Sequence, residues 1–359
     1  MTFFERWHLD KPLFTALLIL AGVSLVVLYS ASGENLRFAL SDASRLLVGF
    51  VIMITIAQIS PETYRRWSVP VFVAGVLGLG AVLAIGAVRF GARRWIAMGP
   101  LSIQPSEFMK LFVPMMLSWF FSRYHLPPRL WQIASATLIL LVPVLLIAKE
   151  PDLGTALIVL LSGVIVLFLA GMGWRTITAV ALLGLGAAPI FWAHMHHYQR
   201  QRIFVLFHPE ADPLGAGYHA IQAMIAVGSG GIFGQGWLQS SQAHLHFLPD
   251  STTDFAFAVF CQEFGLFGNL ALLALYLFIV YRGLRIAFAA QDTYSRLLAG
   301  SLSILFFFDV FINMGMVAGI LPVVGVPLPL LSYGGTSLII VMAGLGVLMS
   351  IHSHRRLVN

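Results

Sequence analysis

The sequence predicts an all-α, polytopic membrane protein with about ten transmembrane helices. Hydrophobic residues make up 59% of the 359 residues, and charged residues only 10%, whereas a soluble globular domain carries roughly 25% charged residues. A chain this apolar cannot cover itself with polar surface and therefore needs lipid as its solvent. Its apolar residues also gather in stretches of the length that a membrane helix requires, about 20 residues.

The apolar stretches follow one another along the chain, so we expect a single membrane domain covering residues 1–359. The first stretch is long enough to span and lacks a small-residue cleavage site, so we expect no cleavable signal peptide. The fourth stretch is short and begins with polar residues, which makes it a candidate for a partly re-entrant segment. The expected helices lie near residues 12–30, 44–60, 68–88, 108–122, 130–148, 154–171, 175–193, 254–281, 296–320 and 331–351.

One long hydrophilic segment, residues 194–253, precedes the eighth expected helix. Loops of this size tend to be functional or disordered. This one is rich in aromatic, glycine and apolar residues, so we expect an ordered cap at the extracytoplasmic surface. Residues 218–227 have the amphipathic pattern of a helix that lies in the membrane interface.

The distribution of cations predicts the orientation. An even number of spans places both termini on one side, and the cytoplasm is favoured because twelve Lys and Arg then lie inside against nine outside. The outer cations could bind an anion. The alternative is that they lie outside only because a long loop is translocated whatever its charge. Because the cations form no run or face, we expect no nucleic-acid partner. The single Cys261 excludes a disulfide framework, and no HExxH zinc motif occurs.

Asp254 is the candidate general base. It opens an apolar helix after the run Phe247-Leu-Pro-Asp-Ser-Thr-Thr253. Ionisable residues beside a membrane helix are functional candidates by default, and a helix N-terminus favours the ionised form that a base requires. The alternative is that Asp254 caps the helix, which is a common role for Asp.

Glu107 and Lys110 stand three residues apart on one expected helix face and can pair. They are candidate substrate contacts, but a structural ion pair that neutralises both charges is the simpler interpretation. Asp309 and Asn313 are expected to form an interhelical polar contact. Glu263 falls on roughly the opposite helix face from Asp254, so the two should not form a carboxylate dyad.

Three further groups lie in outer loops. Asp152 follows Pro151 in a turn, where it could cap the next helix or bind a divalent cation. Arg200 and Arg202 offer guanidinium groups suited to bidentate phosphate binding. Arg94 is a similar candidate, with interfacial anchoring beside an aromatic belt as its alternative.

Several long motifs resemble the SEDS family (shape, elongation, division and sporulation) in its RodA form, from the first expected helix to His352. The most specific is the 23-residue string from Asn313 to Gly335. Similar motifs are Gln104-Pro-Ser-Glu107, Pro151-Asp-Leu-Gly-Thr155, Tyr198-Gln-Arg-Gln-Arg202, Asp212-Pro-Leu-Gly-Ala-Gly-Tyr-His219, Gly228-Ser-Gly-Gly231, Phe247-Leu-Pro249 and Thr253-Asp-Phe255.

The resemblance implies a ten-helix enzyme of the cytoplasmic (inner) membrane that polymerises lipid II into peptidoglycan glycan strands for cell elongation. Asp254 would then be the catalytic carboxylate and would face the periplasm. A divalent cation, Mg²⁺ or Mn²⁺, is implied, with Asp254 or Asp152 as a possible ligand. A class B penicillin-binding protein and other elongation-complex proteins are the implied partners. The candidate substrate-binding residues are Arg200, Arg202, Glu107, Lys110, Asp152, Arg94 and Arg45.

The sequence departs from the family at a few positions. Glu150 stands where the family usually has Gln. Ser41 stands near the position where the family tends to carry a basic residue, and Arg45, one turn further on, can substitute for that residue. Two rival functions remain from the residues alone. One is a lipid II flippase, which would not need Asp254 as a base. The other is a non-enzymatic scaffold of a wall-synthesis complex.

Overall fold

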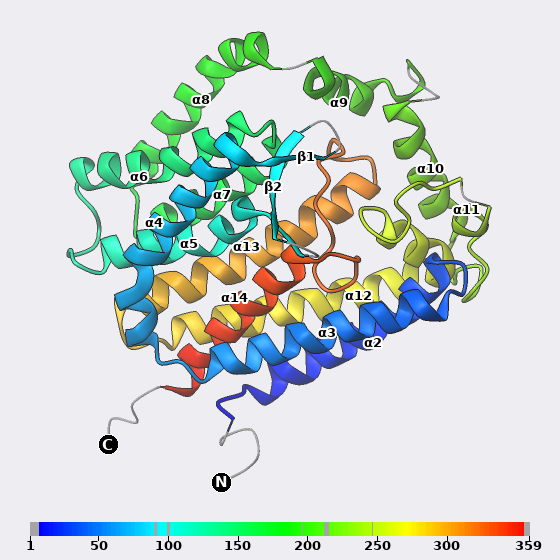
Figure 1. The fold of residues 1–359 in the computed structure, drawn as a ribbon, viewed down its shortest axis with the longest axis horizontal. Coiled ribbons are helices and arrows are strands. Elements are labelled where there is room, and N and C mark those ends of the chain that lie inside the picture. The colour runs from blue at the N-terminus through cyan, green and yellow to red at the C-terminus, as the bar shows by residue number, and fades with distance from the viewer. Residues whose placement is uncertain are drawn as a thin grey trace.

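The computed structural model describes residues 7–89, 92–98, 101–195, 197–211, 215–245 and 247–354. Each of the ten predicted stretches forms a helix (Figure 1). These helices are α2 (Lys11–Ala31), α3 (Leu36–Ala57), α4 (Pro61–Ile85), α5 (Pro105–Phe121), α6 (Leu130–Lys149), α7 (Leu153–Leu169), α8 (Trp174–His194), α12 (Ala256–Phe288), α13 (Thr293–Val317) and α14 (Thr336–Ser353).

Seven helices in the described part of the chain are long and apolar enough to cross a membrane: α2, α3, α4, α6, α12, α13 and α14. The all-α, polytopic prediction is therefore confirmed. The number of ten spans stays a prediction, because α5 and α7 have 17 residues each and α8 is not among the seven.

Local sequence signals set several helix starts. Asp10 caps α2, and its Oδ1 accepts a hydrogen bond of 2.9 Å from the Leu13 N–H. Asn35 and Asp292 cap α3 and α13 in the same way. Such side chains satisfy N–H groups that have no partner in the first helical turn. α4 and α5 instead begin with Pro61 and Pro105, and proline fits the first position because its N–H is not needed there.

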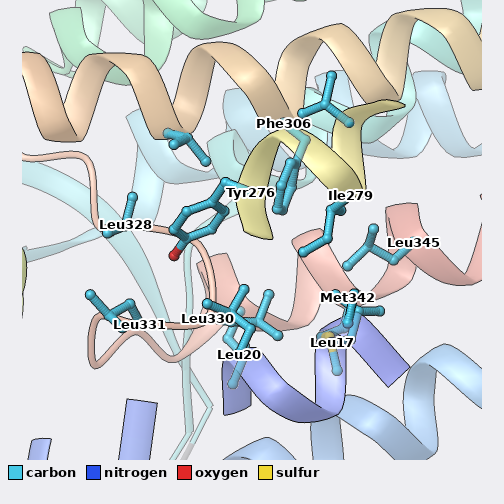
Figure 2. Packing of buried hydrophobic residues seen from close by; sticks show 14 of the residues in the cluster. Leu17, Leu20, Tyr276, Ile279, Phe306, Leu328, Leu330, Leu331, Met342 and Leu345 are labelled. Atoms are coloured by element: carbon cyan, nitrogen blue, oxygen red, sulfur yellow. The ribbon is translucent and has the colours of Figure 1, made fainter. Parts of the chain in front are cut away.

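The core lies where α2, α12, α13 and α14 meet. Figure 2 shows Leu20, Tyr276, Phe306 and Met342 from these four helices packed together. The Tyr276 hydroxyl is buried and donates a 2.7 Å hydrogen bond to the Pro329 carbonyl. Lipid tails are as apolar as these side chains, so close packing and polar contacts of this kind hold membrane helices together.

A small sheet follows α4, which the sequence did not predict. It consists of β1 (Ala87–Arg89), β2 (Ala92–Met98) and β3 (Leu101–Ile103), in the order β1-β2-β3 with antiparallel pairing. The third predicted span therefore ends at Ile85 rather than at residue 88. β1 and β3 have only three residues each, too few for the alternating pattern over four to eight residues that identifies a strand in a sequence.

The segment 194–253 contains the helices α9 (His197–Phe207), η1 (Pro209–Ala211), α10 (Ala216–Ser229) and α11 (Ser241–His244). α10 confirms the helix expected at 218–227. The following turn packs into a break in α12 at Gly265, where φ is +62°. There the Gln235 N–H donates to the Gln262 carbonyl (3.0 Å), and the Leu266 N–H donates to the Gly231 carbonyl (3.0 Å).

Candidate active site

Asp254 lies in a tight turn before α12, not on the helix itself. The backbone N–H groups of Thr253 and Phe255 donate to the Asp250 carbonyl at 3.0 and 3.3 Å. Phe255 is the N-cap residue of α12, which begins at Ala256. The prediction that Asp254 opens the helix is therefore wrong by two residues. The capping alternative is also excluded, because no side chain caps α12.

Asn313 of α13 holds this turn in place. Its fully buried side-chain amide donates to the carbonyl of Asp254 at 3.0 Å and to that of Val326 at 2.7 Å. Instead of the expected interhelical contact, Asn313 thus binds backbone carbonyls of the turn before α12 and of the loop after α13. A second bond joins the same two segments, because the Tyr333 N–H donates to the Thr252 carbonyl at 2.8 Å. The turn 250–255 and the loop 318–335 form one hydrogen-bonded unit.

The Asp254 carboxylate is half-buried beside an exposed glycine. A Cβ atom at Gly325 would lie 3.4 Å from Asp254 Oδ2. The pKa of Asp254 is raised to about 6, mainly by burial and also by Asp250, while Arg202 acts against both. At neutral pH most of the group is ionised, and its pKa is close to the value that suits a general base.

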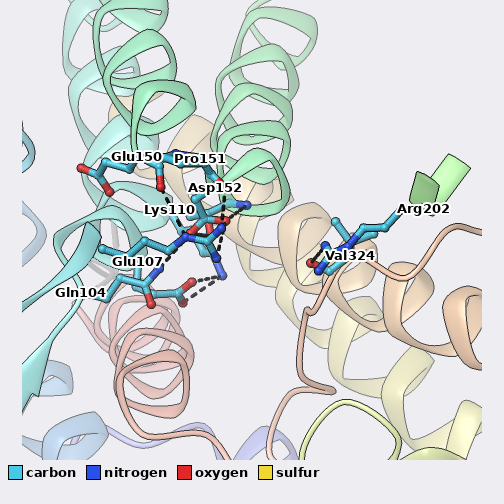
Figure 3. Close-up of polar contacts among 10 residues, drawn as sticks. Gln104, Glu107, Lys110, Glu150, Pro151, Asp152, Arg202 and Val324 are labelled. Carbon is cyan, nitrogen blue, oxygen red and sulfur yellow. Dashed lines mark hydrogen bonds and ion pairs between the residues drawn. The ribbon is translucent and has the colours of Figure 1, made fainter. Parts of the chain in front are cut away.

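The positive charge of Arg202 acts on this carboxylate, whereas Arg200 is bonded elsewhere. Arg202 Nη1 lies 3.5 Å from the Val324 carbonyl (Figure 3), and Arg202 is exposed. Arg200 Nη2 instead donates to the Ala193 carbonyl of α8 at 2.8 Å. Of the two predicted phosphate-binding arginines, the structure brings Arg202 to Asp254.

Asp152 is buried in a polar cluster at the start of α7. It accepts hydrogen bonds from Gln104 Nε2 (2.9 Å) and from Thr155 Oγ1 (3.0 Å) and N–H (3.3 Å). Arg94 Nη1 lies 3.8 Å away, and the same guanidinium donates to the Glu150 and Pro151 carbonyls. The capping prediction for Asp152 is confirmed.

The loop 318–335 connects this cluster to Asp254. A Cβ atom at Gly154 would lie 2.9 Å from the Val324 carbonyl oxygen, so α7 can approach this loop closely only because residue 154 is glycine. The same Val324 carbonyl is the contact of Arg202. Asp152, Arg202 and Asp254 thus border one short stretch of loop.

Glu107 and Lys110 form the predicted ion pair. Lys110 Nζ lies 2.9 Å from both Glu107 carboxylate oxygens, and both residues are buried. The pair lines a pocket with Asp309, which has one carboxylate oxygen without a hydrogen-bond partner in the described structure. The geometry favours the structural interpretation, because a lysine held by one carboxylate and lying near another is poorly placed to bind an anion.

Arg45 does not point at Asp254. Its guanidinium lies 3.5 Å above the centre of the Tyr333 ring, and the Phe38 ring lies 4.6 Å from the same ring. Such a cation–π contact is worth about 0.5–2 kcal/mol. Arg45 therefore fixes Tyr333, whose N–H holds the turn at Thr252. The motif from Asn313 to Gly335 contains Tyr333, but nothing in it pointed to Arg45, because the contact joins residues almost 300 positions apart.

A divalent cation fits Asp254 better than Asp152. Both Asp152 oxygens are engaged by donors, and Arg94 is close by. The described residues contain no cluster of three or more His, Cys, Asp or Glu that could hold a metal. Mg²⁺, however, usually needs only one or two carboxylates plus substrate phosphates, which Asp254 and the neighbouring Asp250 could offer. Such an ion would neutralise charge on a phosphate leaving group.

In chemical terms, the site has a carboxylate near its working pKa, an exposed guanidinium beside it and an open approach at Gly325. This arrangement can remove a proton from a hydroxyl and stabilise an anionic leaving group at the same time. Sequence reasoning identified Asp254 and Arg202 but missed Asp250 as their electrostatic neighbour, although its spacing of four residues from Asp254 was visible.

Comparisons with known proteins identify the family of this chain. A model of the cell cycle protein family FtsW/RodA/SpoVE matches residues 10–357. The peptidoglycan glycosyltransferase MrdB of Escherichia coli K12 is 48% identical over 359 residues, covering 100% of this chain and 97% of that protein. The peptidoglycan glycosyltransferase RodA of Treponema pallidum is 30% identical, with 96% of this chain and 98% of that protein covered.

Solved structures show the same fold. One matching chain comes from the structure "Structural coordination of polymerization and crosslinking by a peptidoglycan synthase complex". It matches with a TM-score of 0.83 and 30% identity, covering 96% of this chain and 97% of that one. The rod shape determining protein RodA of Thermus thermophilus matches with a TM-score of 0.72 and 29% identity, covering 96% of each chain. The chain therefore belongs to the FtsW/RodA/SpoVE family of cell cycle proteins, as its motifs predicted.

Proposed function

We propose that this membrane protein is a peptidoglycan glycosyltransferase that polymerises lipid II into glycan strands for cell elongation. The observation that carries the proposal is the Asp254 carboxylate, whose backbone is held by Asn313 and on which the positive charge of Arg202 acts. The relatives MrdB and RodA, named as peptidoglycan glycosyltransferases over nearly the full chain length, support it.

In the proposed reaction, Asp254 takes the proton from the 4-hydroxyl of the acceptor sugar. That oxygen forms a bond to the anomeric carbon of the donor with inversion. The bond from this carbon to the pyrophosphate oxygen breaks, and the electron pair leaves with undecaprenyl pyrophosphate. General-base assistance contributes about 10²–10⁴-fold in rate. Arg202 stabilises the negative charge that develops on the leaving group.

The same proposal covers orientation and partners. The termini lie in the cytoplasm, and Asp254 faces the periplasm, where lipid II would be used. The match to a chain of a peptidoglycan synthase complex that coordinates polymerization and crosslinking supports a class B penicillin-binding protein as the partner that crosslinks the product.

The test is glycan synthesis from purified lipid II and Mg²⁺ or Mn²⁺. The protein is assayed alone and with a cognate penicillin-binding protein whose own transpeptidase is inactivated. We expect long glycan strands from the wild type and at least a 100-fold lower rate from Asp254→Asn, the lower end of general-base assistance. Glu210→Gln, which neutralises an exposed carboxylate of the same loop, is the matched control and should polymerise normally.

Two outcomes would overturn this function. Normal polymerisation by a folded Asp254→Asn variant would remove the base assignment. Absence of polymer from the wild type under every partner condition, with lipid II still transported in liposomes, would instead favour a flippase.

A further inference from the structure

The outer part of α3 carries a buried acid that the proposed reaction does not use. Asp42 is 3% exposed, and its Oδ2 atom has no hydrogen-bond partner in the described part of the chain. A carboxylate in such a place is costly unless another charge or a hydrogen bond compensates it. α3 is long and apolar enough to cross a membrane, and ionisable side chains in such helices are functional candidates by default.

Asp42 shares one face of α3 with the two residues that contact the Tyr333 ring. Phe38, Asp42 and Arg45 are spaced by four and then three residues, which places them along one stripe of a helix. All three side chains are buried or half-buried, whereas the neighbouring Ser41 is exposed. The stripe faces the loop 318–335, because the Arg45 guanidinium lies 3.5 Å from the centre of the Tyr333 ring. The Phe38 ring lies 4.6 Å from the same ring.

The charge of Asp42 compensates the charge of Arg45. The two groups act on each other electrostatically. Arg45 is half-buried, and its Nη1 atom is buried without a hydrogen-bond partner among the described residues. The face of the Tyr333 ring attracts this cation as well. Without the carboxylate, the guanidinium would be half-buried without its counter-charge and would gain by turning from the ring toward water.

Tyr333 passes this constraint to the turn that holds the base. Its N–H donates to the Thr252 carbonyl at 2.8 Å, two residues before Asp254. Two glycines follow Tyr333 directly, and glycine leaves a backbone free to adopt many conformations. The clamped ring therefore restricts a segment that the glycines alone would leave mobile.

We propose that Asp42 is a positioning residue for the general base, because it keeps the Arg45 guanidinium on the Tyr333 ring. The chain of contacts continues from the Tyr333 N–H to Thr252 and so to the turn that carries Asp254. This inference rests on the proposed function and adds a residue to its reaction. It also gives Arg45 a role other than substrate binding. Loss of a positioning contact lowers kcat, whereas loss of a substrate contact raises KM.

The first test is the kinetics of Asp42→Asn in the polymerisation assay. The substitution keeps the shape of the side chain and removes its charge. We expect kcat to fall about 10–100-fold with the KM for lipid II unchanged, because a displacement of about 1 Å at the reacting groups can cost about 10²-fold. Asp42→Glu keeps the charge and should restore most of kcat. Glu34→Gln, which neutralises an exposed carboxylate just before the same helix, is the matched control and should behave as wild type.

A double-mutant cycle separates a chain of contacts from independent structural effects. Tyr333→Leu removes the ring and should lower kcat about as much as Asp42→Asn, whereas Tyr333→Phe keeps a ring beneath the guanidinium and should lose much less. Asp42→Asn combined with Tyr333→Leu should be about as active as either single variant, because residues of one contact chain are not additive. Losses that multiply in the double variant, or an unchanged kcat in folded Asp42→Asn, would overturn the proposal. If Asp42→Asn does not fold, an unchanged kcat in Tyr333→Leu would overturn it.

Hydrogen exchange follows the same contacts without enzyme activity. In Asp42→Asn the Tyr333 amide should exchange about tenfold faster or more, because its bond to Thr252 opens more often once the ring is released. Glu34→Gln should exchange as wild type does, and unchanged exchange in Asp42→Asn would overturn the proposal. If wild type polymerises lipid II and these tests fail, the positioning role alone is wrong. If wild type makes no polymer but Asp42→Asn still exposes the Tyr333 amide, the proposed function fails and the contact chain stands.

Discussion

Three features of its surroundings set the pKa of the Asp254 carboxyl. Burial and the nearby Asp250 raise its pKa, Arg202 lowers it, and the net pKa is about 6. A general base is active only when ionised. Activity should therefore fall as the pH drops through about 6, since the carboxylate then becomes protonated.

Two substitutions should move this acid limb in opposite directions. Arg202→Gln removes a positive charge that favours the carboxylate, so the midpoint of the kcat/KM profile should shift to higher pH. Asp250→Asn removes a repelling charge and should shift it to lower pH. Polymerisation rates measured between pH 5 and 8 check this. An acid limb that stays fixed in both variants would show that another group controls it.

Glu150 is a second carboxyl with an unusual environment. It is fully buried, and neither carboxylate oxygen has a hydrogen-bond partner among the described residues. Burial and then Asp152 raise its pKa to about 8, against the effect of Arg94. The side chain thus carries its proton at neutral pH. In that state it resembles the neutral glutamine that the family resemblance leads us to expect here.

This gives a stability prediction. An unfolded Glu ionises near pH 4.3, so a native pKa of about 8 means that the stability contributed by the protonated form is lost as pH rises toward 8. Glu150→Gln removes this dependence. The variant should gain thermal stability over wild type at pH 8, by up to a few kcal/mol, and much less at pH 5. Melting temperatures in detergent at the two pH values test it. An equal difference at both would contradict the assigned protonation.

At the scale of elements, the break in α12 is made by backbone from the turn that follows α10. Gly265 has φ of +62°, and a Cβ there would lie 2.2 Å from the Gly234 nitrogen. The turn lies equally close to the helix at Gly234, because a Cβ there would lie 2.1 Å from the Glu263 carbonyl oxygen. Two glycines therefore allow the loop and the helix to exchange backbone hydrogen bonds.

A pair of glycine substitutions separates crowding from backbone strain. Gly231 and Gly234 both have positive φ, +56° and +82°, but a Cβ at Gly231 would meet nothing within 4 Å. Gly231→Ala should cost only the strain of a left-handed residue, about 1–2 kcal/mol. Gly234→Ala adds a clash with backbone and should lower the melting temperature clearly more. Similar losses in the two variants would indicate that the close approach at Gly234 is relaxed in the protein.

At the scale of the whole molecule, a buried acid joins the N-terminal segment to α12 and α14. Asp10 is 1% exposed. It accepts hydrogen bonds from Arg282 Nε (2.9 Å) and Nη2 (2.6 Å), and His352 Nε2 lies 3.1 Å away. Burial alone would raise the pKa of Asp10, but the bonds from Arg282 and Leu13 outweigh it and lower the pKa. Arg282 lies toward the opposite end of α12 from Asp254.

Removing this acid should loosen the bundle without changing the chemistry. Asp10→Asn leaves Arg282 without its counter-charge, and breaking a buried pair typically costs about 3–5 kcal/mol. The melting temperature should fall at pH 7, while the KM for lipid II stays unchanged. Because the pKa of Asp10 is lowered, its contribution is present above about pH 4 and is lost as the pH falls further. A variant as stable as wild type at pH 7 would contradict this role.

The sequence by itself determined the class of the protein, the ten helical segments and most of the chemical groups of the site. Apolar runs, helix caps and motifs are local, so they can be read along the chain. Asp254, Arg202, Asp152 and the Glu107–Lys110 pair were all identified in this way.

Only the tertiary structure decided which of these groups meet. It placed Arg202 at Asp254 while turning Arg200 toward α8, and it engaged Asp152 with Gln104 and Arg94. It also seated Arg45 on Tyr333. These outcomes depend on contacts between segments far apart in the sequence, where packing and hydrogen bonding between helices select one arrangement among many. No local pattern encodes that selection.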